Sequence, residues 1–256
     1  MSADATQLLG RTLVLVAHPD DEAAGCGVLL QRMREPVVVF CTDGAPRDEY
    51  FWRRHGSRAA YAQLRCAEAR TALAHAGASH VEFLDCSAGQ DLFIDQELFR
   101  CLAPAAMQIE ATIERVKPDA LLTLAYEGGH PDHDSCALLA ATIGHARSTP
   151  VWEFPLYHRS AAEQPVVQRF VNIKGDEVEI EPAAAELDRK RQMLREYKSQ
   201  GDILGAFAVE RETFRPMAKY DFTQPPHPGR TNYECWRWRM SCSEVTAAFA
   251  AWLDSK

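Results

Sequence analysis

The sequence predicts an α/β fold, a Rossmann-like, mostly parallel sheet flanked by helices, with a C-terminal β/α extension near the functional site. Short apolar runs at residues 12–17, 37–41 and 120–125 have the length and composition of buried parallel strands. Longer segments rich in helix-forming residues separate these runs, as strand–helix–strand units require. A chain of 256 residues is also long enough to bury the core of one such domain.

The part of the chain before Pro150 contains the predicted core of the sheet. The expected strands lie at residues 12–17, 37–41, 81–84 and 120–125, and the expected helices at residues 23–34, 59–76, 98–116 and 135–147. Gly25 and Gly27 weaken the first helix, but they permit close packing on the strand beside it. Pro104 interrupts or starts the third helix, and residues 126–134 are expected to form a loop.

The pattern changes after Pro150. Residues 151–157 and 166–173 are predicted strands, residues 178–180 are a partner for them, and residues 183–199 form an amphipathic helix. The remaining residues are rich in aromatic side chains, prolines and arginines. The segments at residues 157–159 and 236–239 can line a pocket rim or cap the sheet.

No repeat, low-complexity segment or clear linker divides the chain. We therefore expect residues 1–256 to form a single domain. The resemblance described below implies a core at about residues 10–205, with residues 206–256 as the C-terminal extension.

The composition excludes several classes of protein. Lys and Arg number 28 and Asp and Glu number 36, which gives a formal net charge of −8 and disfavours nucleic-acid binding. The start of the chain lacks the basic and apolar segments of a signal peptide, and no stretch is long enough to span a membrane. We therefore expect a cytoplasmic protein that binds neither nucleic acid nor membrane. The eight cysteines form no CxxC pair, which disfavours a disulfide framework and a cysteine zinc site.

Two segments rich in metal-binding side chains each follow a predicted parallel strand. His18, Asp20 and Asp21 come directly after the first strand, and His-Pro-Asp-His-Asp at residues 130–134 follows the fourth. Because ligand sites of open α/β sheets lie outside the carboxyl ends of the strands, we expect the two segments to meet. A catalytic zinc ion takes three nitrogen or oxygen ligands and keeps one position open for water. Two imidazoles and one carboxylate can hold it, which leaves one carboxylate and one imidazole as base and acid for hydrolysis.

Each segment has a simpler explanation when it is taken alone. A loop histidine is usually solvated or hydrogen-bonded, and residues 20–22 could form an acidic first helical turn. Both segments together favour a metal, because adjacent acidic residues repel one another until a cation binds. Gly25 and Gly27 lack the third glycine of a dinucleotide loop, and the strand–helix alternation argues against the helical phosphohydrolases that bind metal with a His-Asp pair. No GxSxG nucleophile motif is present.

The two segments resemble the signatures of a known family. Residues 17–22, AHPDDE, look like the first motif of the LmbE/PIG-L-like zinc-dependent N-acetylglucosaminyl deacetylases, and residues 130–133, HPDH, resemble the second. Weaker similarities lie in the turn at residues 42–44, in Arg65 with Glu68, and in residues 197–200. The resemblance covers about residues 10–205 and implies a Rossmann-like fold.

The resemblance also implies a role for the main residues of the two motifs. It implies one zinc ion per chain, with ferrous iron as the alternative, bound by His18, Asp21 and His133. Asp20 would be the general base that activates the attacking water. His130 would stabilise the tetrahedral oxyanion or protonate the leaving amine.

Two further residues belong to this pattern, and one position departs from it. Asp132 is expected to orient His130 or a ligand histidine, and Arg65 is expected to bind the substrate or organise the site. Some sugar-deacetylating members of the family carry a Tyr two residues before the first His of the second motif. Gly128 occupies that position here, so the acyl group and the sugar stay open.

The predicted function is hydrolysis of an N-acyl amide, above all N-acetyl, on an amino sugar of the N-acetylglucosamine type or its conjugate. The partner is then a small amino-sugar molecule, and a homo-oligomer stays open. One alternative is an amidase that acts on a thiol-sugar or other N-acyl conjugate. Another is a non-catalytic, metal-containing sugar-binding module. Asp20 and His130 argue against the module, because a structural metal site closes its shell and leaves no such groups over.

Overall fold

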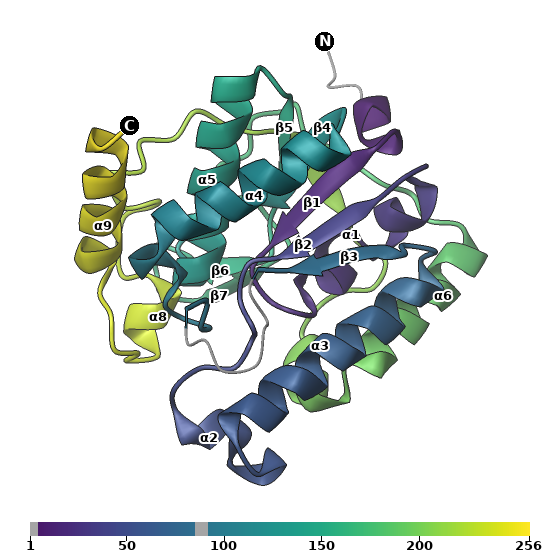
Figure 1. The fold of residues 1–256 in the computed structure, drawn as a ribbon, viewed down its shortest axis with the longest axis horizontal. Helices are drawn as coiled ribbons and strands as arrows, with labels where there is room; N and C mark the ends of the chain where they lie inside the picture. Colours follow the sequence, from purple (N-terminus) through teal and green to yellow (C-terminus); the bar gives the residue numbers. More distant parts are fainter. Residues whose placement is uncertain (1–4, 85–91) are drawn as a thin grey trace.

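The structure is a computed structural model, and it describes residues 5–84 and 92–256 (Figure 1). The strands are β1 Thr12–Val16, β2 Val37–Phe40, β3 His80–Phe83, β4 Ala120–Leu124, β5 Val151–Phe154, β6 Tyr157–Arg159, β7 Pro165–Val167, β8 Val178–Glu179 and β9 Thr213–Pro216. The α-helices are α1 Asp21–Arg32, α2 Glu49–Trp52, α3 Arg58–His75, α4 Leu102–Val116, α5 Pro131–Arg147, α6 Ala184–Glu196, α7 Gly201–Leu204, α8 Asn232–Cys235 and α9 Cys242–Asp254. The short 3₁₀ helices are η1 Ala5–Leu9, η2 Arg53–His55, η3 Leu98–Arg100 and η4 Lys198–Gln200.

The main sheet has the strand order β3-β2-β1-β4-β5-β9-β8. The first five of these strands pair in parallel, and β9 and β8 join them antiparallel at one edge. Every residue of β1, β2 and β4 is buried, as expected for central strands that are covered on both faces. This arrangement confirms the predicted mostly parallel α/β fold.

The order in which the strands join the sheet reverses direction once. After β1 the chain adds β2 and β3 on one side, and it then crosses back to form β4 and β5 on the other side. The strands β2 and β3 lie on one side of β1, and β4 and β5 lie on the other, so β1 and β4 flank the topological switch point. Figure 1 shows α4 and α5 over one face of the sheet and α1 on the other, and α6 packs against both α1 and α3. The loops that follow β1 and β4 therefore open into the same crevice.

Three predicted elements need correction. The helix expected from residue 135 begins at Pro131, since Pro suits the first helical position and His130 caps the helix, so residues 131–134 lie in a helical turn and not in a loop. The strand expected at 151–157 breaks at Pro155, which cannot donate a ladder hydrogen bond. Of residues 166–173 only the first two belong to a strand, and that strand pairs with β6 in a separate hairpin, while β8 pairs with β9.

The C-terminal part of the chain extends the sheet and approaches its carboxyl edge. The strand β9 hydrogen-bonds to β5, and α9 packs against α5. In Figure 1 the arrowhead of β1 points toward β6, β7 and α8. These contacts confirm the predicted C-terminal β/α extension near the site. Of the eight cysteines, Cys86 lies outside the described residues.

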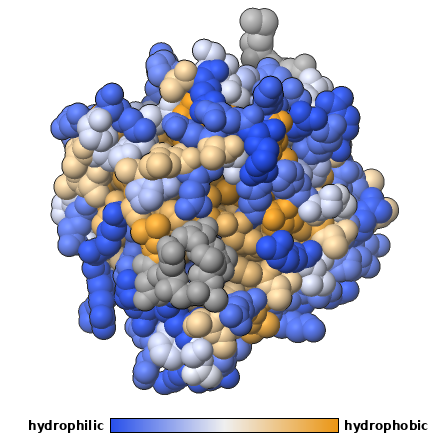
Figure 2. Space-filling model, viewed as in Figure 1, coloured by the Kyte–Doolittle hydropathy of each residue, from blue (hydrophilic) through white to orange (hydrophobic). Residues whose placement is uncertain are grey.

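The surface on the face of the molecule drawn in Figure 2 is mostly hydrophilic, and its hydrophobic residues gather toward the middle of the view. No helix in the described ranges is both long enough and apolar enough to cross a membrane.

Helix α1 is interrupted at Cys26, where the backbone has φ −143° and ψ 24°. The buried carboxylate of Glu212 accepts hydrogen bonds from the backbone N–H groups of Val28 (2.6 Å) and Leu29 (2.9 Å) beyond this kink. Lys190, which is fully buried, neutralises Glu212 across an ion pair of 2.8 Å. The predicted close packing of Gly25 is also confirmed, because a Cβ atom there would lie 2.1 Å from the Phe154 ring.

Replacing Lys190 with Met is expected to destabilise the protein by about 3–5 kcal/mol, because it leaves the Glu212 carboxylate buried without a charge partner. Urea unfolding would measure the loss as a lower transition midpoint. Lys174→Met, at an exposed position, is the matched control and should leave the midpoint nearly unchanged. Equal midpoints for the two variants would contradict a structural role of the buried pair.

Candidate active site

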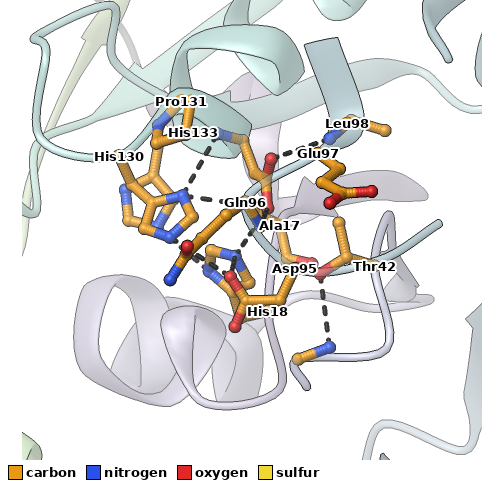
Figure 3. A network of polar contacts seen from close by, with 12 residues as sticks. Ala17, His18, Thr42, Asp95, Gln96, Glu97, Leu98, His130, Pro131 and His133 are labelled. Carbon is orange, nitrogen blue, oxygen red and sulfur yellow. Dashed lines mark hydrogen bonds and ion pairs between the residues drawn. The ribbon is translucent and has the colours of Figure 1, made fainter. Parts of the chain in front are cut away.

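The two predicted motifs meet at the switch point of the sheet. His18 lies two residues beyond the end of β1, and Asp21 opens α1. His130 is the N-cap of α5, and His133 lies in its first turn. The side chains of these four residues are buried, and Figure 3 shows the three imidazoles close together.

The side chains of the three predicted metal ligands contact one another. His18 Nδ1 lies 3.4 Å from Asp21 Oδ2, and His133 Nε2 lies 3.2 Å from Asp21 Oδ1. The two imidazole nitrogens are 3.3 Å apart. Although burial favours the neutral acid, His133 and His18 hold the pKa of Asp21 well below its usual range. We call His18, Asp21 and His133 the ligand triad.

The second nitrogen of His18 contacts carboxylates on the side away from the ligand triad. Its Nε2 lies 3.1 Å from Asp132 Oδ2 and 3.3 Å from Asp95 Oδ1. Although burial disfavours the charged ring, Asp95 and Asp21 raise the pKa of His18 well above its usual value. The carboxylate of Asp132, itself fully buried, also accepts the N–H groups of Gln96 (2.6 Å) and Leu98 (2.9 Å). Of the two predicted partners of Asp132, the geometry favours the ligand histidine, because His130 Nδ1 is 3.8 Å away.

Asp95 is a site residue that the motifs do not include. It lies in the segment after β3, and its Oδ1 is 3.3 Å from Nε2 of both His18 and His130 (Figure 3). His18 and His130 lower its pKa against the effect of burial. The only signal in the sequence is its position, beyond the carboxyl end of a third parallel strand, where ligand-binding residues collect.

Asp20 holds an unusual backbone conformation next to the ligand triad. Its φ is 133°, a strained value for a residue with a side chain, and strain of this kind clusters at functional sites. Arg65 Nη2 lies 2.9 Å from Asp20 Oδ2, and the same guanidinium donates to the carbonyls of Pro19 and Gly44. Burial raises the pKa of Asp20 to about 7, although Arg65 acts in the opposite direction.

The weaker sequence similarities also come together in space. Glu68 accepts hydrogen bonds from the backbone N–H (3.0 Å) and the hydroxyl (2.6 Å) of Ser199. The Tyr197 hydroxyl donates to the buried carboxylate of Glu22, and the Gln200 amide donates to the Tyr61 hydroxyl. The segment at residues 197–200 thus binds α1 and α3 together behind Asp20 and Arg65.

Gly128 has no room for a side chain. Its φ of 68° is in the left-handed region, and a Cβ atom there would lie 2.9 Å from Pro226 Cγ and 3.0 Å from Thr231 Cγ2. The C-terminal extension therefore occupies the space that a Tyr at this position would require. Tyr157 of β6 instead brings an aromatic ring to the site, 5.2 Å from the His133 ring centre.

A cavity of about 460 Å³ opens beside these residues. His18, Asp20, Asp21, Asp95 and His130 line its charged end, and Arg65 also reaches it. The predicted rim segments contribute as well, and their lining residues are Tyr157, His158, Arg159, Trp236 and Trp238. The volume is ordinary for a small-molecule site.

Fold and site together define a class, an α/β protein of Rossmann-like topology with a His/Asp cluster at its switch point. Within that class the chain belongs to the PIG-L family, since the family model described as GlcNAc-PI de-N-acetylase matches residues 13–143. The matched part runs from β1 into α5 and contains both motifs, which confirms the LmbE/PIG-L resemblance. No curated protein sequence matches the chain significantly.

Solved structures share the fold at low sequence identity. The deacetylase Dbv21, which is described as acting on the A40926 pseudoaglycone, is 20% identical with a TM-score of 0.62, over 82% of this chain and 98% of that one. The N,N'-diacetylchitobiose deacetylase of Pyrococcus horikoshii is 17% identical with a TM-score of 0.54, over 81% and 83%. The 4-carboxy-2-hydroxymuconate hydratase GalB of Pseudomonas putida is 15% identical with a TM-score of 0.54, over 82% and 99%. The fold therefore hosts deacetylases and a hydratase, and the site must decide the reaction.

Proposed function

We propose that the protein is a zinc-dependent hydrolase that removes an N-acyl group, above all N-acetyl, from an amino sugar of the N-acetylglucosamine type. The observation that carries the proposal is the meeting of the ligand triad with two further titratable groups, Asp20 and His130. The family of the chain supports the amino sugar, and the deacetylases among the structural relatives agree with it. All three solved structures are at most 20% identical, so each supports the fold, and the residues of the site favour hydrolysis over the hydratase reaction.

The ligand triad fits a divalent cation. Two imidazole nitrogens and a carboxylate are a common ligand set for catalytic zinc, and ferrous iron accepts the same set. Asp132 would accept a hydrogen bond from the Nε2–H group of His18, as carboxylates do for metal-bound histidines. Buried carboxylates surround the position, so a cation would relieve their mutual repulsion. A bound zinc ion supplies a Lewis acid that polarises the amide carbonyl and makes water more acidic.

Asp20 is proposed as the general base. Burial raises its pKa to about 7, close to the value at which a base takes a proton from water near neutral pH. Arg65 holds the carboxylate in place through the 2.9 Å ion pair and is itself held by two carbonyls. We therefore propose that Arg65 organises Asp20, and that binding of substrate is its lesser role.

His130 is proposed as the group that stabilises the oxyanion or protonates the leaving amine. Its Nδ1 accepts the backbone N–H of Asp132 at 3.1 Å, so the ring proton resides on Nε2. Burial and the neighbouring His18 lower its pKa, which keeps the ring neutral at rest. Asp95, 3.3 Å from Nε2, would stabilise the ring when it becomes charged during turnover.

Metal content and amine release together test the proposal. We expect near one zinc per purified chain, and amine release from N-acetylglucosamine derivatives that chelation abolishes and zinc restores. No bound metal, even after zinc is supplied, would overturn the proposal. Bound metal together with amine release only from thiol-sugar or other N-acyl conjugates would support the alternative, an amidase that acts on such conjugates.

A variant at His130 distinguishes the proposed hydrolase from the alternative of a non-catalytic sugar-binding module. One of the nitrogen atoms of His130 lies within 4.8 Å of a nitrogen of His18 and of a nitrogen of His133, so it could close the metal shell as a fourth ligand. His130→Gln should keep the metal and lose turnover if the protein is a hydrolase. Loss of metal in this variant, together with no turnover in the wild type, would support the module. Cytoplasmic location and a small-molecule partner stay predictions from the sequence.

Replacing Asp132 with Asn is expected to weaken zinc binding about 10–100-fold, because the amide cannot stabilise a proton on His18 Nε2 as a carboxylate does. Competition with a chromogenic chelator would measure the change. Asp254→Asn, at an exposed position on α9, is the control and should bind zinc as the wild type does. Unchanged affinity in Asp132→Asn would contradict the proposed contact.

A further inference from the structure

The cavity beside the ligand triad has two unlike ends. One end carries the charged residues of the proposed hydrolase. The other end is formed by side chains from β6, α7 and the segments that follow α7 and α8, namely Tyr157, Ile203, Leu204, Phe207, Trp236 and Trp238. We call these six residues the apolar wall. None of them lies in the part of the chain that the family model matches.

The apolar wall begins at the reacting centre. The ring centres of Trp238 and His130 are 4.8 Å apart, and those of Tyr157 and His133 are 5.2 Å apart. Trp236 continues the surface, with its ring centre 5.1 Å from that of Trp238 and 6.1 Å from that of Tyr157. A ligand whose amide reaches the ligand triad therefore extends directly along aromatic side chains.

Two members of the apolar wall expose a large part of their surface to the cavity mouth. Ile203 is 53% exposed and Trp236 is 47% exposed. Only four other large apolar side chains are exposed in residues 5–84 and 92–256, and none of those four lines the cavity. Exposed apolar surface gathered in a concave site marks a surface that a ligand covers.

Two polar side chains near the apolar wall, Arg159 and Gln200, already have protein partners. Arg159 donates to Asn232 Oδ1 at 2.7 Å, and Gln200 donates to Tyr61 and to Ser199. A bare sugar would need free donors and acceptors here for its hydroxyl groups, and the aliphatic side chains of Ile203 and Leu204 offer none.

The charge of the cavity disfavours an anionic substituent. Asp202 lines the mouth beside Ile203, and Asp20, Asp21 and Asp95 line the inner end. The guanidinium of Arg65 is held by Asp20 and two carbonyls. Four carboxylates line the cavity against two guanidiniums, those of Arg65 and Arg159. Both guanidiniums already bond to protein atoms, so the lining favours a neutral chain or ring over a phosphate group.

We propose that the substrate carries a neutral apolar chain or ring, which the apolar wall binds while the amide lies at the ligand triad. This assignment of the substrate class rests on the proposed function. The apolar group belongs either to the acyl chain or to the group attached at the sugar's anomeric carbon. Both sources present the same chemistry to the wall.

Three probes separate the two sources, and all are used below their micellar concentrations. They are methyl N-acetyl-β-glucosaminide, octyl N-acetyl-β-glucosaminide and the methyl glycoside of N-octanoylglucosamine. Binding to the zinc-loaded protein is followed by tryptophan emission, and kcat/KM by amine release. Burial of each methylene raises the affinity about fourfold. Three buried methylenes therefore predict that one octyl probe is preferred roughly 60-fold over the methyl probe. The preferred probe identifies the side of the amide on which the apolar group lies.

The variant Ile203→Asn tests the wall directly, with Ile173→Asn as its matched control. Ile173 is 81% exposed and lies outside the cavity lining. We expect Ile203→Asn and Trp236→Ala each to reduce the octyl preference at least about fivefold, which is a loss of little more than one buried methylene. Ile173→Asn should keep the wild-type preference.

The two readouts distinguish failure of this inference from failure of the proposed function. Equal binding of the methyl and octyl probes by the wild type would overturn the proposed role of the apolar wall, whether or not amine is released. An octyl preference in binding that Ile203→Asn removes would support the wall even if no probe is hydrolysed. If no probe is hydrolysed by a protein that has one metal bound, the result would count against the proposed hydrolase and not against the apolar wall.

Discussion

Asp20→Asn is expected to lower kcat by about 10²–10⁴-fold while one zinc ion per chain stays bound. The asparagine keeps the shape of the side chain and its contact with Arg65, but it cannot accept a proton from water. Amine release under saturating substrate and metal analysis of the same preparation would measure the two quantities. Asp188→Asn, on the exposed side of α6, is the control and should match the wild type in both. Full activity in a zinc-loaded Asp20→Asn protein would show that another group is the base.

The same variant should change the pH dependence of kcat/KM. A general base acts only when it is ionised, so the activity of the wild type should rise with pH through the pKa of Asp20. Burial raises that pKa to about 7, and a cation held by the ligand triad would favour the carboxylate and lower it from there. We therefore expect the acid limb of the wild-type profile at or below about pH 7. Its persistence in Asp20→Asn would assign the limb to a different group.

His133→Ala is expected to abolish both metal binding and activity. It removes one of three ligands from a triad whose side chains contact one another at 3.2 to 3.4 Å, and the remaining imidazole and carboxylate form an incomplete zinc site. We expect less than about a tenth of the wild-type metal content after dialysis, with activity at the level of chelated wild type.

His145→Ala is the matched control for this variant, because His145 lies on the same helix and is exposed. It should retain the metal and the activity of the wild type. Thermal unfolding of both variants would show that α5 is intact. A His133→Ala protein that kept a full complement of zinc would remove His133 from the ligand triad.

The sequence predicted the central sheet because each core strand is a local pattern. Residues 12–17 and 120–125 read as buried strands, and β1 and β4 match them to within a residue. The motif residues follow from the same reasoning, since they stand directly after these strands and parallel strands share a carboxyl edge. Helix ends were less well predicted where a proline or a cap decided them, as at Pro131 and His130.

The partners of the site residues were not predictable in the same way. Asp95 has no motif around it, and its contact with His18 depends on how the segment after β3 packs. The Glu212 carboxylate that accepts the backbone N–H of Val28 beyond the kink of α1 lies 184 residues further along the chain. Such contacts require the packed structure, because no local periodicity records which distant segment arrives.

By itself the sequence determined the fold class, the family and the residues of the two motifs. Each of these depends on a strand pattern or on residues adjacent in the chain. Only the tertiary structure decided that Asp132 contacts His18, that Arg65 holds Asp20, and that aromatic side chains of the C-terminal part line the cavity. The physical reason is that hydrogen bonds and apolar contacts between distant segments form only when the sheet brings those segments to a common edge.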